Sequence, residues 1–145
     1  MSVTAPLFKH HKHCDDIFAG AEEACADGNW RVGAEAFGRF RSEIESHFAS
    51  EEEMLFPAFE RVTGMTAGPT AVMREEHKQM RALLGQMADA VVAKDADTFG
   101  GAAETLLILM QQHNMKEENI LYPMCDSALA GTDLATSLAE RLVPA

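Results

Sequence analysis

The chain has 145 residues, enough for one average domain with a single hydrophobic core, and it carries a formal net charge of −11. This charge argues against nucleic acid or a membrane as a partner, because it repels phosphate backbones and anionic lipid. Aromatic residues make up only 7% of the chain and methionine occurs nine times, a balance typical of helices packed on helices.

Helix-breaking residues divide the chain into four long stretches. The breaks lie at 27–29, 64–69 and 94–97 and at Gly131. Apolar residues recur every three or four positions in the first two stretches, and histidines lie on the same stripes. A weaker pattern at about 133–142 predicts a short C-terminal helix.

An internal repeat relates the two halves of the chain. The segments 47–57 and 113–123 both read H-x-x-x-E-E-x-x-L-[FY]-P, at an offset of 66 residues. The same offset aligns His11 with His77, and in both places a lysine follows. We infer two αα-hairpins related by a pseudo-two-fold axis.

These observations predict the architecture. The hairpins span about 6–62 and 70–128, and a tail follows at 131–145. The connections are short, which favours antiparallel neighbours. We therefore expect an all-α, antiparallel up-down four-helix bundle built as a duplicated αα-hairpin, with a short C-terminal helix, as a single domain over 1–145.

The repeat also selects candidate metal ligands. Residues four apart on a helix share one face, so each His-x-x-x-Glu pair can direct an imidazole and a carboxylate at one point inside the bundle. Of the three histidines near the N-terminus, only His11 is matched by a histidine in the other half. The candidate set is His11, His47, Glu51, His77, His113 and Glu117.

The alternative is a set of core histidines paired with glutamates. Burying four imidazoles and two carboxylates without a cation is costly, whereas divalent ions would satisfy all six. Imidazole with carboxylate suits iron, zinc, copper or nickel. The three cysteines form no C-x-x-C pair and are interpreted as small core or surface residues, and the Glu-x-x-His motif of ferritin-like bundles is absent.

Neighbouring residues are given lesser roles. Glu43 and Asp15 each lie one turn from a candidate histidine and could add a ligand, but a salt bridge or a hydrogen bond to a ligand is favoured. Tyr122, nine residues after His113, is expected to lie too far along its helix to ligate. Five further polar residues are expected to face solvent: His10, His13, Glu52, Glu53 and Glu118.

The duplicated motifs, with both single histidines in place, resemble the hemerythrin or HHE cation-binding domain family from about residue 7 to 125. The resemblance implies two iron ions in an oxo- or hydroxo-bridged di-iron centre. It implies that His11 and His47 hold one iron and that His77 and His113 hold the other. Glu51 and Glu117 would bridge them, and the symmetry of the repeat leads to the same partition.

One position departs from the oxygen-carrying members of that family. They have a further histidine four residues after the position of His77, where this chain has Arg81, expected on the same inward face. A guanidinium stays protonated and cannot ligate a metal. The remaining six ligands resemble the set in family members that repair iron centres, which argues against reversible oxygen storage.

We therefore expect a non-haem di-iron protein that binds or responds to a small diatomic, oxygen or nitric oxide, or to peroxide. An iron carrier or iron-centre repair protein is the alternative. A di-iron oxidase or peroxidase has less support, because no acid–base pair is found beyond the ligands, and a binding or sensing role is favoured over an enzyme. No signal-peptide pattern and no apolar run of membrane-spanning length is found, so a cytoplasmic location is expected.

Overall fold

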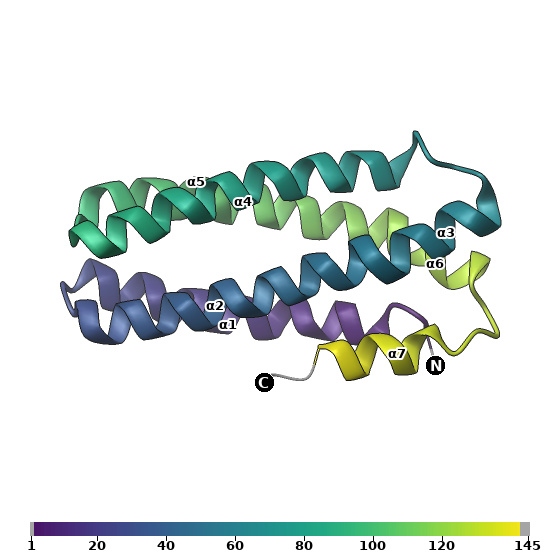
Figure 1. Ribbon diagram of the computed structural model, residues 1–145, viewed down its shortest axis with the longest axis horizontal. Helices are drawn as coiled ribbons and strands as arrows, with labels where there is room; N and C mark the ends of the chain where they lie inside the picture. Colours follow the sequence, from purple (N-terminus) through teal and green to yellow (C-terminus); the bar gives the residue numbers. More distant parts are fainter. Residues whose placement is uncertain (1, 143–145) are drawn as a thin grey trace.

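The computed structural model describes residues 2–142, and its regular elements are all helical. Four long helical segments run along the longest axis of the molecule (Figure 1). Two of them continue through a π-helical turn, labelled η, into a further helix. In chain order the elements are α1 Ala5–Ala26, α2 Trp30–Ser50, η1 Glu51–Leu55, α3 Phe56–Thr63, α4 Pro69–Ala93, α5 Ala96–Lys116, η2 Glu117–Leu121, α6 Tyr122–Ala128 and α7 Leu134–Arg141.

The helices close into a four-membered ring. α1 packs against α2 and α4 packs against α5, while α1 also contacts α5 and α2 contacts α4. The α1–α2 and α4–α5 connections lie at the same end of the bundle (Figure 1). α7 packs along α1 and α2. The predicted antiparallel four-helix bundle is thus confirmed, with the short C-terminal helix in place.

The repeat extends to the helix ends. The Asn29 side chain accepts a hydrogen bond from the backbone N–H of Val32 at 3.5 Å and caps α2. Asp95, 66 residues later, accepts one from the N–H of Thr98 at 3.1 Å and caps α5. The residue before each cap has a positive φ, 75° at Gly28 and 54° at Lys94. Both hairpins therefore turn in the same way.

Each π-helical turn precedes a proline, Pro57 or Pro123. A proline has no N–H to donate, and in a regular α-helix its ring would clash with the carbonyl four residues earlier. The backbone hydrogen bonds before each proline instead reach back five residues, as in a π-helix. The N–H of Phe56 bonds to the carbonyl of Glu51, and that of Tyr122 bonds to the carbonyl of Glu117. The extra residue rotates everything after it by about 100° relative to a straight α-helix.

Two apolar clusters fill the bundle, with the candidate ligands between them. One cluster contains Phe18, Phe40 and Leu84, and the other contains Leu7 and Leu55. Along each long helix, a candidate histidine lies between residues of the two clusters. All six candidate ligands are at most 5% exposed. The sequence therefore buries a polar layer across the middle of a hydrophobic interior.

Other buried residues agree in part with the sequence-based expectations. The three cysteines, interpreted as small core or surface residues, are all buried and free. None of the helices within residues 2–142 has the length and hydropathy that crossing a bilayer requires.

Candidate metal centre

The six candidate ligands meet at one level of the bundle, and each carboxylate lies between histidines of different halves. Glu117 Oε1 is 3.1 Å from His11 Nε2 and 3.4 Å from His113 Nε2. Glu51 Oε1 is 3.1 Å from His77 Nε2 and 3.7 Å from His47 Nε2. This is the placement that a ligand bridging two ions needs.

Hydrogen bonding leaves part of this cluster unsatisfied. Within residues 2–142, four buried side-chain atoms make no hydrogen bond of favourable geometry, although two of them, Glu51 Oε1 and His77 Nε2, lie 3.1 Å apart. All four belong to candidate ligands: Glu51 Oε1, Glu117 Oε2, His77 Nε2 and His113 Nε2. Leaving one buried polar atom unpaired costs about 1–3 kcal/mol. Cations placed between these atoms would remove that cost, so the residues fit a metal centre with nitrogen and oxygen ligands.

Three of the four histidines are oriented by a carboxylate on the far side of the ring. His11 Nδ1 lies 2.6 Å from Glu118 Oε2, and His77 Nδ1 lies 2.7 Å from Glu52 Oε2, at equivalent positions in the repeat. His113 Nδ1 lies 2.8 Å from Glu76 Oε1. A proton held on Nδ1 leaves the Nε2 lone pair free for a metal. The expectation that Glu52 and Glu118 face solvent is therefore wrong.

The fourth histidine, His47, has a different partner. Its Nδ1 lies 2.9 Å from Nδ1 of His10, which occupies the place of Glu76 in the repeat. His10 is 7% exposed, so the expectation that it faces solvent is wrong. Its Nε2 lies 3.5 Å from Glu43 Oε2, and the half-buried His13 lies 3.0 Å from Glu43 Oε1. Glu43 thus contacts these two histidines rather than the six candidate ligands.

Tyr122 lies inside the cluster, contrary to expectation. Its hydroxyl is 2.7 Å from Glu51 Oε2 and 3.2 Å from Glu117 Oε1, and it also lies within 3.4 Å of the Nε2 atoms of His11 and His47. Burial, with Glu117 and Glu51 nearby, raises the pKa of Tyr122 well above its ordinary value, so it is a neutral phenol that donates.

The expectation counted residues along the helix from His113, but the ligand Glu117 lies only five residues before Tyr122, and the π-helical turn decides which face Tyr122 takes. On a straight helix, nine residues from His113 amount to about 180° beyond whole turns, which would put Tyr122 on the opposite face. The extra residue of the π-helical turn rotates Tyr122 back toward the ligands. Pro123 was the available signal, because a proline in mid-helix disrupts the α-helical hydrogen bonds.

Apolar rings pack against His77, which corresponds to His11 in the repeat. Phe56 occupies the place of Tyr122 in the repeat, and its ring centroid lies 5.8 Å from that of His77. Phe48 stacks on the same imidazole, with ring centroids 4.1 Å apart. The two halves thus share their ligand types but differ in surroundings: a hydroxyl near His11 and His47, and two phenyl rings around His77.

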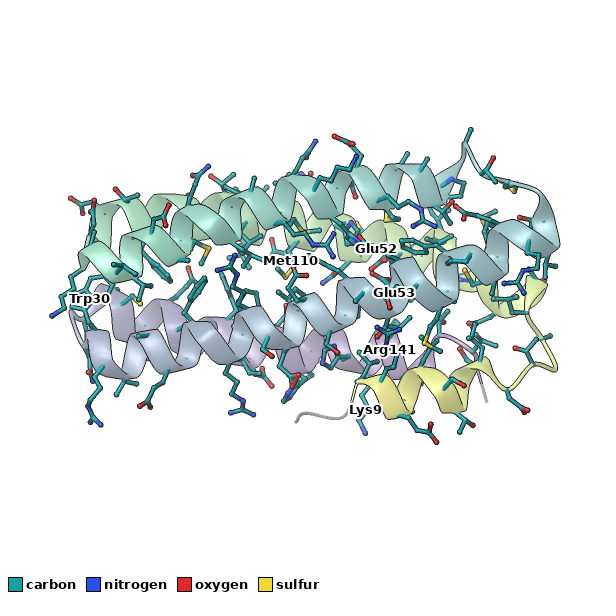
Figure 2. The ribbon with its side chains drawn as sticks, in the orientation of Figure 1. Lys9, Trp30, Glu52, Glu53, Met110 and Arg141 are labelled. Atoms are coloured by element: carbon teal, nitrogen blue, oxygen red, sulfur yellow. The ribbon has the colours of Figure 1, made fainter. Side chains whose placement is uncertain are left out.

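Arg81 does not point at the ligands, so its expected inward orientation is wrong. Its guanidinium donates to both oxygens of Glu52, at 2.8 and 3.0 Å, and to Glu45 at 2.9 Å. Figure 2 shows Glu52 directed toward α4 and Glu53 toward Arg141 of α7. Burial by itself raises the pKa of Glu52, but hydrogen bonds from His77 and Arg81 lower it to about 2. Arg81 therefore acts on the site through Glu52.

Asp15 stands in the place of Arg81 in the first half. Its side chain is exposed, and no hydrogen bond among the described residues joins it to a candidate ligand. Glu53, which was expected on the outer face, is 63% exposed and pairs with Arg141. Neither residue belongs to the cluster.

Charge in the metal-free cluster is carried by paired histidines and glutamates. Burial alone lowers the pKa of His113, but Glu117, Glu51 and Glu76 raise it to about 9. Burial holds the pKa of His47 well below its usual range. Ligands must be deprotonated to bind a metal, so metal uptake has to displace protons from histidines such as His113.

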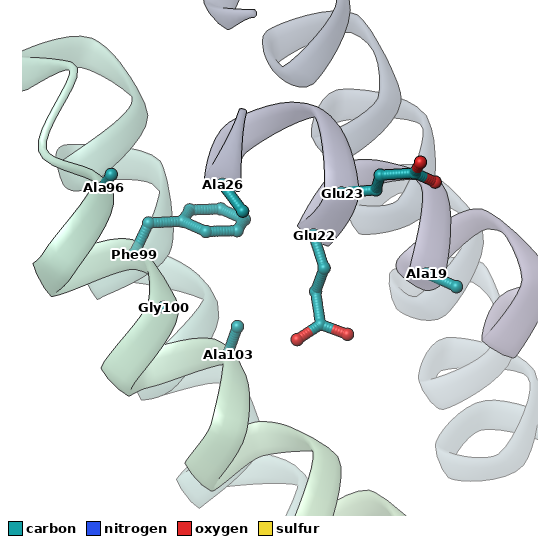
Figure 3. A pocket seen from close by; sticks show the side chains of 8 residues that line it. All are labelled: Ala19, Glu22, Glu23, Ala26, Ala96, Phe99, Gly100 and Ala103. Atoms are coloured by element: carbon teal, nitrogen blue, oxygen red, sulfur yellow. The ribbon is translucent and has the colours of Figure 1, made fainter. Parts of the chain in front are cut away.

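A separate hollow of about 390 Å³ lies between α1 and α5 (Figure 3). Small side chains line it together with Phe99, Glu22 and Glu23. It contains none of the six candidate ligands, so the metal centre and this hollow are separate features.

Comparison with known proteins gives a family match over most of the chain. The family model of the hemerythrin HHE cation binding domain matches residues 3–125, which include both repeats and all six candidate ligands. No curated protein and no solved structure shows significant similarity to the chain.

Proposed function

Because the chain belongs to the hemerythrin HHE cation binding domain family, we propose that its buried cluster holds two iron ions and presents them to a small ligand: oxygen, nitric oxide or peroxide. The four unpaired buried atoms of the candidate ligands are the observation that supports this most directly. Bound iron would supply redox chemistry and the coordination positions that six protein ligands leave open.

The distances support a specific division of the ligands. His11 and His47 would hold one ion, and His77 and His113 the other. Glu117 lies between His11 and His113, and Glu51 between His47 and His77, so both carboxylates would bridge. The carboxylates on Nδ1 would keep the imidazoles oriented as the metal enters or leaves.

The surroundings favour ligand binding on the side of His11 and His47. The Tyr122 hydroxyl is a hydrogen-bond donor there, and a diatomic or peroxide that gains negative charge on binding would be stabilised by such a donor. On the other side, Phe48 and Phe56 pack against His77 and keep water away. The ion held by His11 and His47 would thus have a hydrogen-bond donor beside it, and the ion held by His77 and His113 would have apolar surroundings.

An iron carrier is the second candidate, and Arg81 is the observation that favours it. Its guanidinium is bound to Glu52 and Glu45 and adds no ligand, so the ions would have only six protein ligands between them. The two candidates differ in the rate at which iron leaves. A carrier should release iron to a strong chelator within minutes, whereas a binding or sensing protein should retain it.

The test is metal analysis with optical spectra of protein purified without oxygen from iron-replete cells. We expect about two irons per chain and a spectral change on adding oxygen, nitric oxide or peroxide. Glu51→Ala should lose most of the metal, while Glu53→Ala, a matched change at an exposed neighbour, should retain it. Zinc in place of iron, or full iron retention by Glu51→Ala, would contradict the proposal.

A further inference from the structure

A second cluster of metal-binding side chains lies beside the first. His10 and His13, three residues apart on α1, direct their Nε2 atoms at the two oxygens of Glu43 on α2, at 3.5 and 3.0 Å. One ligand atom from each of the three residues lies within 4.8 Å of the other two. Two imidazoles and a carboxylate at this spacing form a set that suits Fe²⁺, Co²⁺ or Zn²⁺.

The cluster has no counterpart in the second half. The repeat offset aligns His10, His13 and Glu43 with a glutamate, a glutamine and a leucine at positions 76, 79 and 109. Duplication of the ligand hairpins therefore does not explain why these three residues are together. Because the exposed Gln79 takes the place of His13 in the second half, a substitution of Gln79 is a matched control for a substitution of His13.

Among the described residues, Glu43, like Glu118 and the candidate ligands Glu51 and Glu117, has no fixed positive charge beside it, whereas three half-buried carboxylates do. Glu52 pairs with Arg81, Glu76 with Lys116 and Glu60 with Arg74. Glu43 is only 6% exposed, and within residues 2–142 its ion-pair partners are the two histidines alone. A buried carboxylate without a cation is costly, and a divalent ion would supply the missing charge.

We propose that His10, His13 and Glu43 form an outer divalent-metal site through which metal is loaded into the His11–His47 position. His13 is 38% exposed, so the outer site is open to solvent. On its inner side, His10 Nδ1 lies 2.9 Å from His47 Nδ1. The site therefore connects solvent to one ligand of the buried centre.

The contact between His10 and His47 makes the two positions alternate, because one proton lies between their Nδ1 atoms. When His10 binds metal through Nε2, its proton is on Nδ1 and is donated to His47, which then keeps its own proton on Nε2 and cannot ligate. When His47 binds metal through Nε2, it donates its Nδ1 proton to His10, whose own proton is on Nε2 and faces Glu43. As the inner position fills, the shared proton moves to His47 Nδ1, the Nε2 proton of His47 is released, and His10 takes a proton on Nε2 from solvent. Each ring has one proton in both states, so the inner position fills as the outer one empties.

The test follows Co²⁺ uptake by metal-free protein, mixed rapidly and monitored by visible absorption. We expect His13→Ala and Glu43→Gln to slow the binding of one of the two ions by about tenfold or more, the size of effect that losing a residue of a metal site has on metal affinity. The final cobalt content of both variants should still reach that of the wild type. Gln79→Ala, the matched change in the second half, should take up cobalt at the wild-type rate.

The outcomes separate this proposal from the proposed function on which it rests. Wild-type protein that never binds two cobalt ions would refute the two-ion centre itself. Two ions bound at wild-type rates by both His13→Ala and Glu43→Gln would overturn the loading site alone. If Glu43→Gln does not fold, His13→Ala decides alone, because it changes a side chain that is 38% exposed: two cobalt ions bound at the wild-type rate by this variant would overturn the proposal.

Discussion

Replacing Tyr122 by phenylalanine would remove one hydroxyl and leave the buried ring in place. The hydroxyl donates to Glu51 Oε2 at 2.7 Å, and Glu51 Oε1 already lacks a partner. An acceptor left unsatisfied in the interior costs about 1–3 kcal/mol. We expect the metal-free variant to lose about that much free energy of unfolding, a fall in Tm of about 2–4 °C for each kcal/mol in a chain of this size.

The loss should be smaller in iron-loaded protein. There the metal would bind the Glu51 oxygens, so the hydroxyl would matter less, and we expect a loss below about 1 kcal/mol. Urea unfolding followed by circular dichroism, without oxygen, would measure both forms. Thr70→Val is the matched control, because the buried Thr70 hydroxyl donates to Glu60 at 2.6 Å and neither residue belongs to the ligand cluster.

Thr70→Val should therefore cost the same in the metal-free and the iron-loaded protein. If Tyr122→Phe also costs the same in both forms, the metal does not replace the hydroxyl at Glu51. The assignment of Glu51 as a bridging ligand would then be refuted, even if iron is present.

Two further predictions concern the residues around the second ion. Arg81→Met should weaken metal binding by about tenfold in competition with a chelator, because Glu52 loses the cation that holds it against His77; unchanged affinity would show that Glu52 needs no such support. The raised pKa of His113, about 9 in metal-free protein, stabilises the fold fully below about pH 6.5 and less as pH rises through 9. The urea stability of metal-free protein should therefore fall across this interval while metal affinity rises, and His113→Gln should flatten the fall in stability.

The sequence by itself determined the helices, their pairing and the residues of the central cluster. Helical period and turn residues are local properties of the chain, so the stretches could be located without knowing the fold. The repeat distinguished His11 from its neighbours His10 and His13, because only His11 has a histidine 66 residues later. The helical period of one stretch alone could not make this distinction. Burial of all six candidate ligands at one level follows from that shared register.

Only the tertiary structure decided what surrounds these ligands. Tyr122 faces them because a π-helical turn before Pro123 shifts the phase of the helix, and a phase count on a straight helix gives the wrong face. Arg81 donates to Glu52 and Glu45, carboxylates that α2 and η1 bring beside it from another part of the chain. The partner on Nδ1 of each histidine likewise comes from a neighbouring helix. The contacts of Arg81 and of the Nδ1 atoms depend on how helices are packed, and spacing along one helix contains no information about them.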